Sequence, residues 1–304
     1  IVAISSYASF FWQPIMNLGN IFNNFINNIA YLERIFETMD EPVTVSDKEN
    51  AKEMPTIRGE VTFDHVAFSY DETKKILKDV SFTVKPGESV ALVGPTGAGK
   101  STIVNLISRF YNVDSGRVLI DGQDISEVTI HSLRSQMGIM MQDSFIFSGT
   151  IGDNIRYGKL TASEDEIRKA SRIVCADDFI SRMPEGYDTE VRERGSMLSQ
   201  GQKQLISFAR TLLSDPSILI LDEATSSIDV QTEKALQTGL NAMLQGRTSF
   251  IIAHRLSTIR GCDRIMYIDD GGIMETGSHE ELMAKKGYYY KLYTAQLEEV
   301  HKTA

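Results

Sequence analysis

The feature that most constrains the fold is the octet GPTGAGKS, residues 94–101, which follows the apolar run SVALV and precedes the helix-like stretch TIVNLISRF. Its glycines let consecutive backbone N–H groups turn toward phosphate oxygens, and the start of the following helix adds the positive end of its dipole. Lys100 supplies a point charge, and the Ser101 hydroxyl is suited to coordinating Mg²⁺. Strand, loop and helix in this order predict a phosphate-binding loop in a parallel α/β core.

A pair of carboxylates follows a later apolar run, in SILILDEATSSID, residues 217–229. Asp222 and Glu223 fall at the predicted C-terminal end of a strand, where open α/β sheets bind their ligands. We expect Asp222 to hold a metal's coordination shell and Glu223 to accept a proton from an attacking water. An acidic helix start is the alternative, but the phosphate-binding loop in the same chain disfavours it.

Three more polar or aromatic residues end predicted strands. Gln142 follows MGIMM, His254 ends SFIIAH, and Tyr70 closes VAFSY, 24 residues before Gly94. Each is unremarkable by itself. Alternation in Val61–Phe68 predicts an additional antiparallel part beside the parallel sheet.

Bulk properties exclude several classes of function. The 304 residues carry a formal charge of −10, and no basic run interrupts that balance, so we expect no nucleic-acid partner. The two cysteines, Cys175 and Cys262, match no metal-ligand spacing, and we expect no structural metal.

The N-terminal segment has a different character from the rest of the chain. No charged residue occurs before Glu33. After Pro14 the apolar residues recur every three or four positions, which predicts a helix. We interpret residues 1–40 as a helix that leaves a membrane, with an amphipathic helix packed on the following domain as the alternative. The charged stretch 41–56 reads as a linker, and residues 57–304 as one domain.

A second anion-binding motif is suggested by LSQGQ, residues 198–202. Ser199 and Gln202 have the spacing of a capping box that opens a helix. That reading leaves Gly201 unexplained, since a glycine in the first turn costs up to about 1 kcal/mol but allows backbone amides to approach an oxyanion closely. We therefore expect an anion at this helix start.

These pieces, in this order, resemble the nucleotide-binding domain of an ABC transporter. LSQGQ, 23 residues before the Asp222–Glu223 pair, is the most specific of them, and FSGTIGDNIRYG and GYYYKLYTAQL are similar to fused exporters of the multidrug, lipid and peptide type. The resemblance implies a P-loop NTPase core of class α/β with a mostly parallel sheet, an antiparallel β subdomain and an α-helical subdomain. Residues 1–40 then resemble the end of the last transmembrane helix and its cytoplasmic extension.

The resemblance also implies roles for individual residues. Tyr70 would stack on adenine, His254 would hold the γ-phosphate and Glu223 would polarise the water, while Ser101, Gln142 and Asp222 would coordinate Mg²⁺. The nucleotide would contact Gly94, Pro95, Thr96, Gly97, Ala98, Gly99, Lys100, Ser101 and Thr102. Asp229 would lie at a dimer interface, and Ser199, Gly201 and Gln202 would face the ATP of a partner.

The function that follows is ATP hydrolysis that drives export, with ATP and Mg²⁺ bound. The partners would be a second nucleotide-binding domain, in a homodimer or a heterodimer, and the transmembrane domain of the same transporter, with the ATPase on the cytoplasmic side of a cell membrane. The alternative is a soluble ABC-type ATPase that acts on a macromolecular partner.

Overall fold

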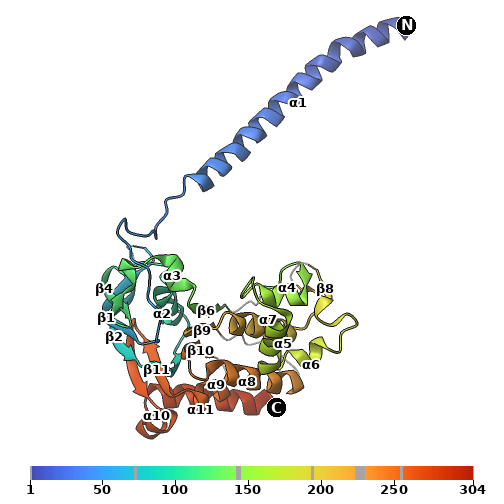
Figure 1. Ribbon diagram of the computed structural model, residues 1–304. Coiled ribbons are helices and arrows are strands. Elements are labelled where there is room, and N and C mark those ends of the chain that lie inside the picture. The colour runs from blue at the N-terminus through green and yellow to red at the C-terminus, as the bar shows by residue number, and fades with distance from the viewer. Residues whose placement is uncertain are drawn as a thin grey trace. The chain divides into compact units, whose positions relative to one another are not determined.

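A computed structural model describes residues 2–71, 74–141, 145–192, 195–222, 230–253 and 256–303, and Figure 1 shows its ribbon. The chain divides into two compact units, Ile1–Thr44 and Val45–Ala304.

The first unit is one long helix, α1 (Val2–Met39). The helical periodicity that begins after Pro14 in the sequence extends back to Val2, so Pro14 lies inside the helix. A proline there removes one backbone hydrogen bond. Across the described ranges, no helix combines the length and the apolar character needed to cross a bilayer.

The second unit contains the strands and the remaining helices. The strands are β1 (Val61–Ser69), β2 (Lys75–Val84), β3 (Ser89–Val93), β4 (Ser115–Ile120), β5 (Gln123–Asp124), β6 (Met137–Met140), β7 (Gly149–Thr150), β8 (Glu190–Val191), β9 (Ile218–Asp222), β10 (Thr248–Ile252), β11 (Arg264–Asp269) and β12 (Gly272–Gly277). The helices are α2 (Lys100–Ile107), α3 (Ile130–Arg134), α4 (Ile151–Arg156), α5 (Glu164–Ile173), α6 (Asp177–Ile180), α7 (Gln200–Leu213), α8 (Val230–Leu244), α9 (Leu256–Gly261), α10 (His279–Lys285) and α11 (Tyr288–Thr303).

Two larger sheets organise this unit. The six-stranded sheet has the order β12-β11-β3-β10-β9-β6. Strands β11, β3, β10, β9 and β6 run parallel, and β12 pairs antiparallel at the edge. The four-stranded sheet, β2-β1-β4-β5, is antiparallel. Helices α4 to α7 gather away from the antiparallel strands (Figure 1). The predicted α/β class, with a parallel core, an antiparallel part, a helical part and a long N-terminal helix, is confirmed.

The parallel strands are buried on both faces, which explains their continuous apolar runs. All five residues of β3 and all five of β10 are buried. On one face, Leu92 and Ile220 join the apolar cluster that contains Ile103 of α2. On the other face, Val93 joins the cluster that contains Phe208 of α7. The sheet thus fixes α2 and α7 on opposite sides of the same strands.

Candidate functional site

The loop between β3 and α2 has the backbone that its glycines predict. Gly94, Gly97 and Gly99 have φ of 140°, 80° and 104°, a region that other residues rarely adopt. A Cβ on Gly94 would lie 2.0 Å from the carbonyl oxygen of Ile268. Gly99 is the N-cap of α2, and no side chain caps that helix. The first N–H groups of α2 therefore lack a side-chain acceptor, as an anion-binding helix start requires.

The Lys100 ammonium folds back over this loop. Its Nζ donates hydrogen bonds to the carbonyl oxygens of Gly94 at 2.9 Å and Pro95 at 2.8 Å. Burial lowers the pKa of Lys100 below its usual 10.5, and the charge of Asp222 opposes part of that shift. The structure therefore brings Lys100 and Asp222 into electrostatic contact, although 122 residues separate them in the sequence.

Tyr70 lies against the start of α2. Its hydroxyl is 3.2 Å from the hydroxyl of Thr102 and accepts a 3.4 Å hydrogen bond from Asn105 Nδ2. The ring makes edge contacts with Phe68 and Tyr111, at centroid distances of 4.9 and 5.0 Å, and 48% of the residue stays exposed. A half-exposed aromatic ring is thus held beside the phosphate-binding loop.

Asn105 and Tyr111 were not among the predicted site residues. Asn105 follows Thr102 by three positions, so a helix places both side chains on one face, and this spacing is a signal that the sequence does contain. The contact of Tyr111 with Tyr70 depends on how the chain turns after α2, and no local pattern indicates it.

The C-terminal ends of the central strands lie at one edge of the sheet. Asp222, the last residue of β9, pairs with Ile252, the last residue of β10, and Ile252 pairs with Leu92 of β3. Leu92, Ile252 and Asp222 therefore lie side by side on three neighbouring strands, and the loop that begins at Gly94 starts two residues after Leu92. This is the edge at which open α/β sheets bind ligands.

Four predicted residues lie outside the described residues: Gln142, Glu223, Asp229 and His254. In sequence, Gln142 comes two positions after the end of β6, Glu223 directly follows β9, and His254 comes two positions after β10. Their roles stay predictions.

The donors available to Mg²⁺ in the described residues are of the type that it prefers. Ser101, in the first turn of α2, is exposed and offers a hydroxyl, and Asp222 offers a carboxylate at the adjacent strand edge. Oxygen ligands of this kind suit Mg²⁺, which usually binds one or two carboxylates together with substrate phosphates. The donor set fits the ion.

The Ser199 motif opens α7 and sits in a capping box. Ser199 Oγ accepts from the N–H of Gln202 at 3.2 Å, and Gln202 Oε1 accepts from the N–H of Ser199 at 2.9 Å. Gly201 is buried in the first turn. In the described residues, no hydrogen bond joins this motif to residues 94–102. The two predicted anion sites are thus not joined by hydrogen bonds within the described part of one chain.

The capping box of α7 differs from its counterparts in charge. The boxes of α4, α5 and α10 use Asp153, Glu166 and Glu281 at the third helical position, whereas α7 uses neutral Gln202 and has no acidic residue in its first turn. A carboxylate at a helix start interacts favourably with the dipole and would repel a second anion. In the first turn of α7, no carboxylate offsets the positive end of the helix dipole.

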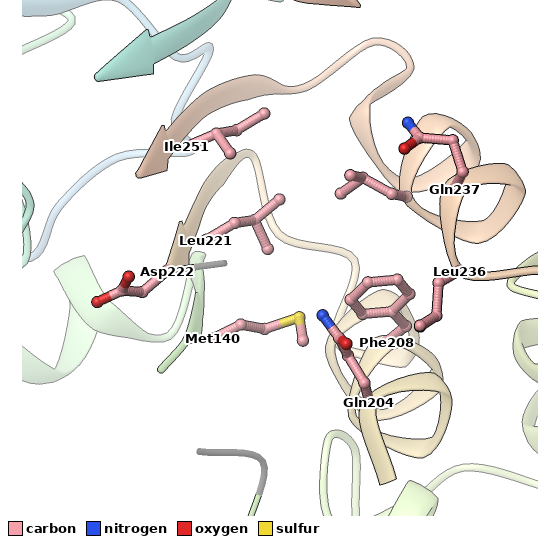
Figure 2. Close-up of a pocket in the computed structure, with 9 residues that line it drawn as sticks. Met140, Gln204, Phe208, Leu221, Asp222, Leu236, Gln237 and Ile251 are labelled. Atoms are coloured by element: carbon pink, nitrogen blue, oxygen red, sulfur yellow. The ribbon is translucent and has the colours of Figure 1, made fainter. Parts of the chain in front are cut away.

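Helix α7 also packs against the strands that end at the candidate site (Figure 2). A small cavity of about 30 Å³ separates Phe208 of α7 from Leu221 of β9 and Ile251 of β10. The Asp222 carboxylate points away from these apolar side chains in Figure 2. This cavity is far too small for a nucleotide. It lies at the interface between α7 and β9, the strand that carries Asp222.

Comparisons with known proteins identify the family to which this chain is similar. Residues 77–226 match the family described as ABC transporter. The chain is 54% identical over 295 residues to an uncharacterized ABC transporter ATP-binding protein, YknV, of Bacillus subtilis, covering 97% of this chain and 49% of that protein. It is 46% identical over 292 residues to a fatty acid ABC transporter ATP-binding/permease protein of Mycobacterium bovis, covering 96% and 46%.

A solved structure of a bacterial Atm1-family ABC exporter with ATP bound is also similar. Its TM-score is 0.81 at 44% identity, over 97% of this chain and 52% of that chain. The chain spans about half the length of the curated relatives it matches.

Proposed function

The chain belongs to the ABC transporter family and carries its ATP-hydrolysing domain, and from this premise we propose that it drives export of a substrate across a membrane. The observation that carries the proposal is the strand edge at which the loop 94–101, Lys100 and Asp222 meet. Phosphates and a metal ion are the ligands that this set of groups accommodates.

In this proposal ATP binds along the β3–α2 loop. The Tyr70 ring stacks on adenine, and the backbone N–H groups of residues 94–102, except Pro95, which has none, surround the phosphates. The Lys100 ammonium exchanges its two carbonyl partners, Gly94 and Pro95, for phosphate oxygens. The exchange is favourable because a phosphate carries a full negative charge and the carbonyl groups carry none.

Mg²⁺ would be held by Ser101, Asp222 and Gln142, and when bound it neutralises charge on the phosphates. Glu223 accepts a proton from the attacking water, and His254 contacts the γ-phosphate. The support for these two roles is their position in sequence directly after β9 and just after β10.

The start of α7 faces the γ-phosphate bound by a second nucleotide-binding domain. Support comes from its acid-free first turn and from the lack, among the described residues, of hydrogen bonds to the chain's own phosphate loop. Because one chain contains both halves of such a site, two copies form two equivalent sites, and a homodimer is the simplest assembly. A heterodimer satisfies the same geometry if the partner contributes one half of each site.

The remaining parts of the transporter follow from the relatives, whose names describe fused ATP-binding/permease proteins. We assign α1 as the end of the last transmembrane helix with its extension, and residues 45–304 as the ATPase on the cytoplasmic side of a cell membrane. The alternative, a soluble ABC-type ATPase that acts on a macromolecule, is disfavoured because fused permease and exporter proteins align over nearly the whole chain.

The Glu223→Gln variant of the full-length protein tests the chemistry. Removal of the base should lower the rate of phosphate release by about 10²- to 10⁴-fold, while the Kd for ATP stays near that of the wild type. Phosphate release at the wild-type rate would contradict the assignment of Glu223.

Membrane fractionation separates the two functional classes. The exporter should remain in the membrane pellet after an alkaline wash that strips peripheral proteins. Quantitative release into the supernatant would favour the soluble ATPase.

A further inference from the structure

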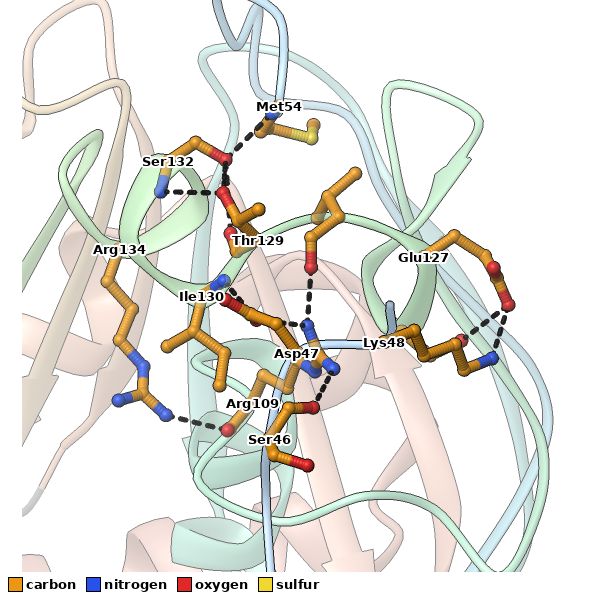
Figure 3. A network of polar contacts seen from close by, with 12 residues as sticks. Ser46, Asp47, Lys48, Met54, Arg109, Glu127, Thr129, Ile130, Ser132 and Arg134 are labelled. Atoms are coloured by element: carbon orange, nitrogen blue, oxygen red, sulfur yellow. Dashed lines mark hydrogen bonds and ion pairs between the residues drawn. The ribbon is translucent and has the colours of Figure 1, made fainter. Parts of the chain in front are cut away.

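The segment 45–57, between α1 and the first strand, is attached to the far end of the phosphate-loop helix. One of its contacts is Arg109, which comes two residues after the end of α2 and whose side chain is 2% exposed. The guanidinium donates to the carbonyl oxygen of Ser46 at 3.0 Å and to that of Val128 at 2.6 Å, and it lies 3.6 Å from the Asp47 carboxylate. Figure 3 shows these groups converging on Arg109.

Asp47 holds two elements at once. The oxygen that faces Arg109 also accepts a 2.8 Å hydrogen bond from the N–H of Ile130, at the start of α3. Beside it, Lys48 pairs with Glu127. We call residues 46–48 the latch. They are held by polar contacts with Arg109, Glu127 and Ile130.

The next part of the segment is anchored differently. Met54 and Ile57 are buried in the apolar core, at 6% and 3% exposure. Their N–H groups donate to Ser132 Oγ and Gln136 Oε1, both at 2.8 Å. Apolar burial therefore stabilises the attachment of residues 54–57, whereas the printed contacts of residues 46–48 are polar.

A cavity of about 420 Å³ lies next to the latch. Its lining includes Ser46 and Lys48 of the latch, Arg109, and Asp124 at the end of β5, together with apolar side chains such as Val118 of β4. Residues 46–48 are exposed along this cavity, and the contacts that the structure describes for their side chains and for the Ser46 carbonyl are polar. We expect loss of these polar contacts to free residues 46–48, while the backbone hydrogen bonds of Lys52 with Glu127 and Thr129 keep the following part of the segment attached.

The Asp47 carboxylate lies where the positive charges of Arg109 and Arg134 come together, and it offsets part of them. Arg134 donates to the carbonyl oxygens of Ser108 and Arg109 at 2.9 and 2.7 Å, so two guanidinium groups meet at the end of α2. Burial and the Arg109 charge lower the pKa of Arg134, and Asp47 opposes that shift. Within the described residues, Arg109 Nε is buried without a hydrogen-bond acceptor. Without Asp47, a buried positive charge would lose its carboxylate partner, which is unfavourable.

Helix α2 connects this latch with the ATP site. Its eight residues span about 12 Å at 1.5 Å per residue, with Lys100 at one end and Arg109 just past the other. Five of the eight residues of α2 are buried. If the helix moves as a rigid body, a change at its C-terminal end alters the placement of Lys100 and Ser101.

We propose that Arg109 is a positioning residue for the ATP site, and that the latch of residues 46–48 lets the chain that arrives from α1 set the position of the phosphate-loop helix. The proposal rests on the proposed ATP-binding function. It assigns a task to a segment whose composition indicates only a linker.

The Asp47→Ala variant of the full-length protein tests the latch, with Glu49→Ala as its matched control. Glu49 is an exposed carboxylate of the same segment, and within the described residues it makes no ion pair or side-chain hydrogen bond. Asp47→Ala should raise the Kd for ATP, measured by calorimetry without turnover, by about 2- to 30-fold, the range of energetic coupling through packed networks. Glu49→Ala should match the wild type.

A purely structural role predicts a different result. It would lower the melting temperature of Asp47→Ala and leave the Kd for ATP equal to that of Glu49→Ala, which would overturn the proposal. The test measures ATP binding and does not depend on hydrolysis. If the wild type bound ATP but did not hydrolyse it, the proposed ATPase function would be contradicted, and the Kd values of the variants would still test the latch.

Arg109→Lys and the double variant complete the test. Arg109 and Asp47 act through one contact, so the double variant should shift the Kd for ATP no further than the larger single change. Additive shifts would mean that the two residues act independently and would overturn the latch. If Arg109→Lys does not fold, the comparison of Asp47→Ala with Glu49→Ala decides alone.

Discussion

The Tyr70 hydroxyl lies 3.2 Å from the Thr102 hydroxyl, which joins the chain just after β1 to the first turn of α2. This contact and the two neighbouring rings fix the plane of a half-exposed tyrosine beside the phosphate loop. The antiparallel sheet therefore contributes an aromatic surface to a site that is otherwise built on the parallel sheet.

Tyr70→Ala should weaken ATP binding by about 1 to 3 kcal/mol, the range for a base stacked on an aromatic side chain. Calorimetric titration with ATP measures this change. Tyr70→Phe keeps the ring and loses only the hydroxyl contacts, so its affinity should stay close to that of the wild type. Equal affinities of the alanine variant and the wild type would show that the base binds elsewhere.

The pH dependence of ATP binding should report the contact between Lys100 and Asp222. Phosphate binding needs the charged ammonium, so the affinity should fall as the pH rises through the lowered pKa of Lys100, at a pH below 10.5. Asp222→Asn removes the charge that raises this pKa, and the fall should then begin at a lower pH. Titrations in EDTA separate this effect from metal binding.

Lys100→Ala is the control for that profile. Without the titrating ammonium, ATP should bind more weakly, and the alkaline fall should disappear. A profile of Asp222→Asn that coincides with that of the wild type would mean that the carboxylate does not influence Lys100 in solution.

The parts of the site that sequence reasoning located are those with local patterns. The glycine spacing of residues 94–101 predicts the backbone that Gly94 and Gly99 adopt, because the required φ values admit few other residues. The capping box of Ser199 and Gln202 is also confirmed. It could be predicted because both of its hydrogen bonds lie within one helical turn. The placement of Asp222 at a strand end follows from the apolar run before it.

Long-range polar contacts could not be predicted in this way. The pairing of Arg109 with Ser46 and Asp47 joins residues more than sixty positions apart, and neither partner belongs to a periodic pattern. The linker composition of residues 41–56 indicates exposure but not attachment. The long N-terminal helix was expected, but the apolar periodicity is clear only after Pro14, so no pattern in the sequence placed this proline inside α1.

Gln202→Glu tests the partner-facing role of the α7 start with an isosteric change. The glutamate should preserve the capping box, since Glu166 and Glu281 occupy the same position in α5 and α10. It also places a negative charge where a γ-phosphate of the second domain would lie. By the size of helix-dipole effects, ATP-driven dimerisation should weaken by about 0.3 to 2 kcal/mol, or about 2- to 30-fold.

The measurement is light scattering of the chain in detergent with ATP, in the Glu223→Gln background so that ATP is not consumed. The Kd for ATP of each single chain should stay unchanged, because residues 94–102 make no hydrogen bond to the motif within the described residues. Gln123→Glu adds the same charge on exposed β5 and should dimerise like the background. Ser199→Arg should block dimerisation, whereas Gln200→Gly should change it little. If Gln202→Glu and Ser199→Arg both dimerise like the background, the motif serves only to cap α7.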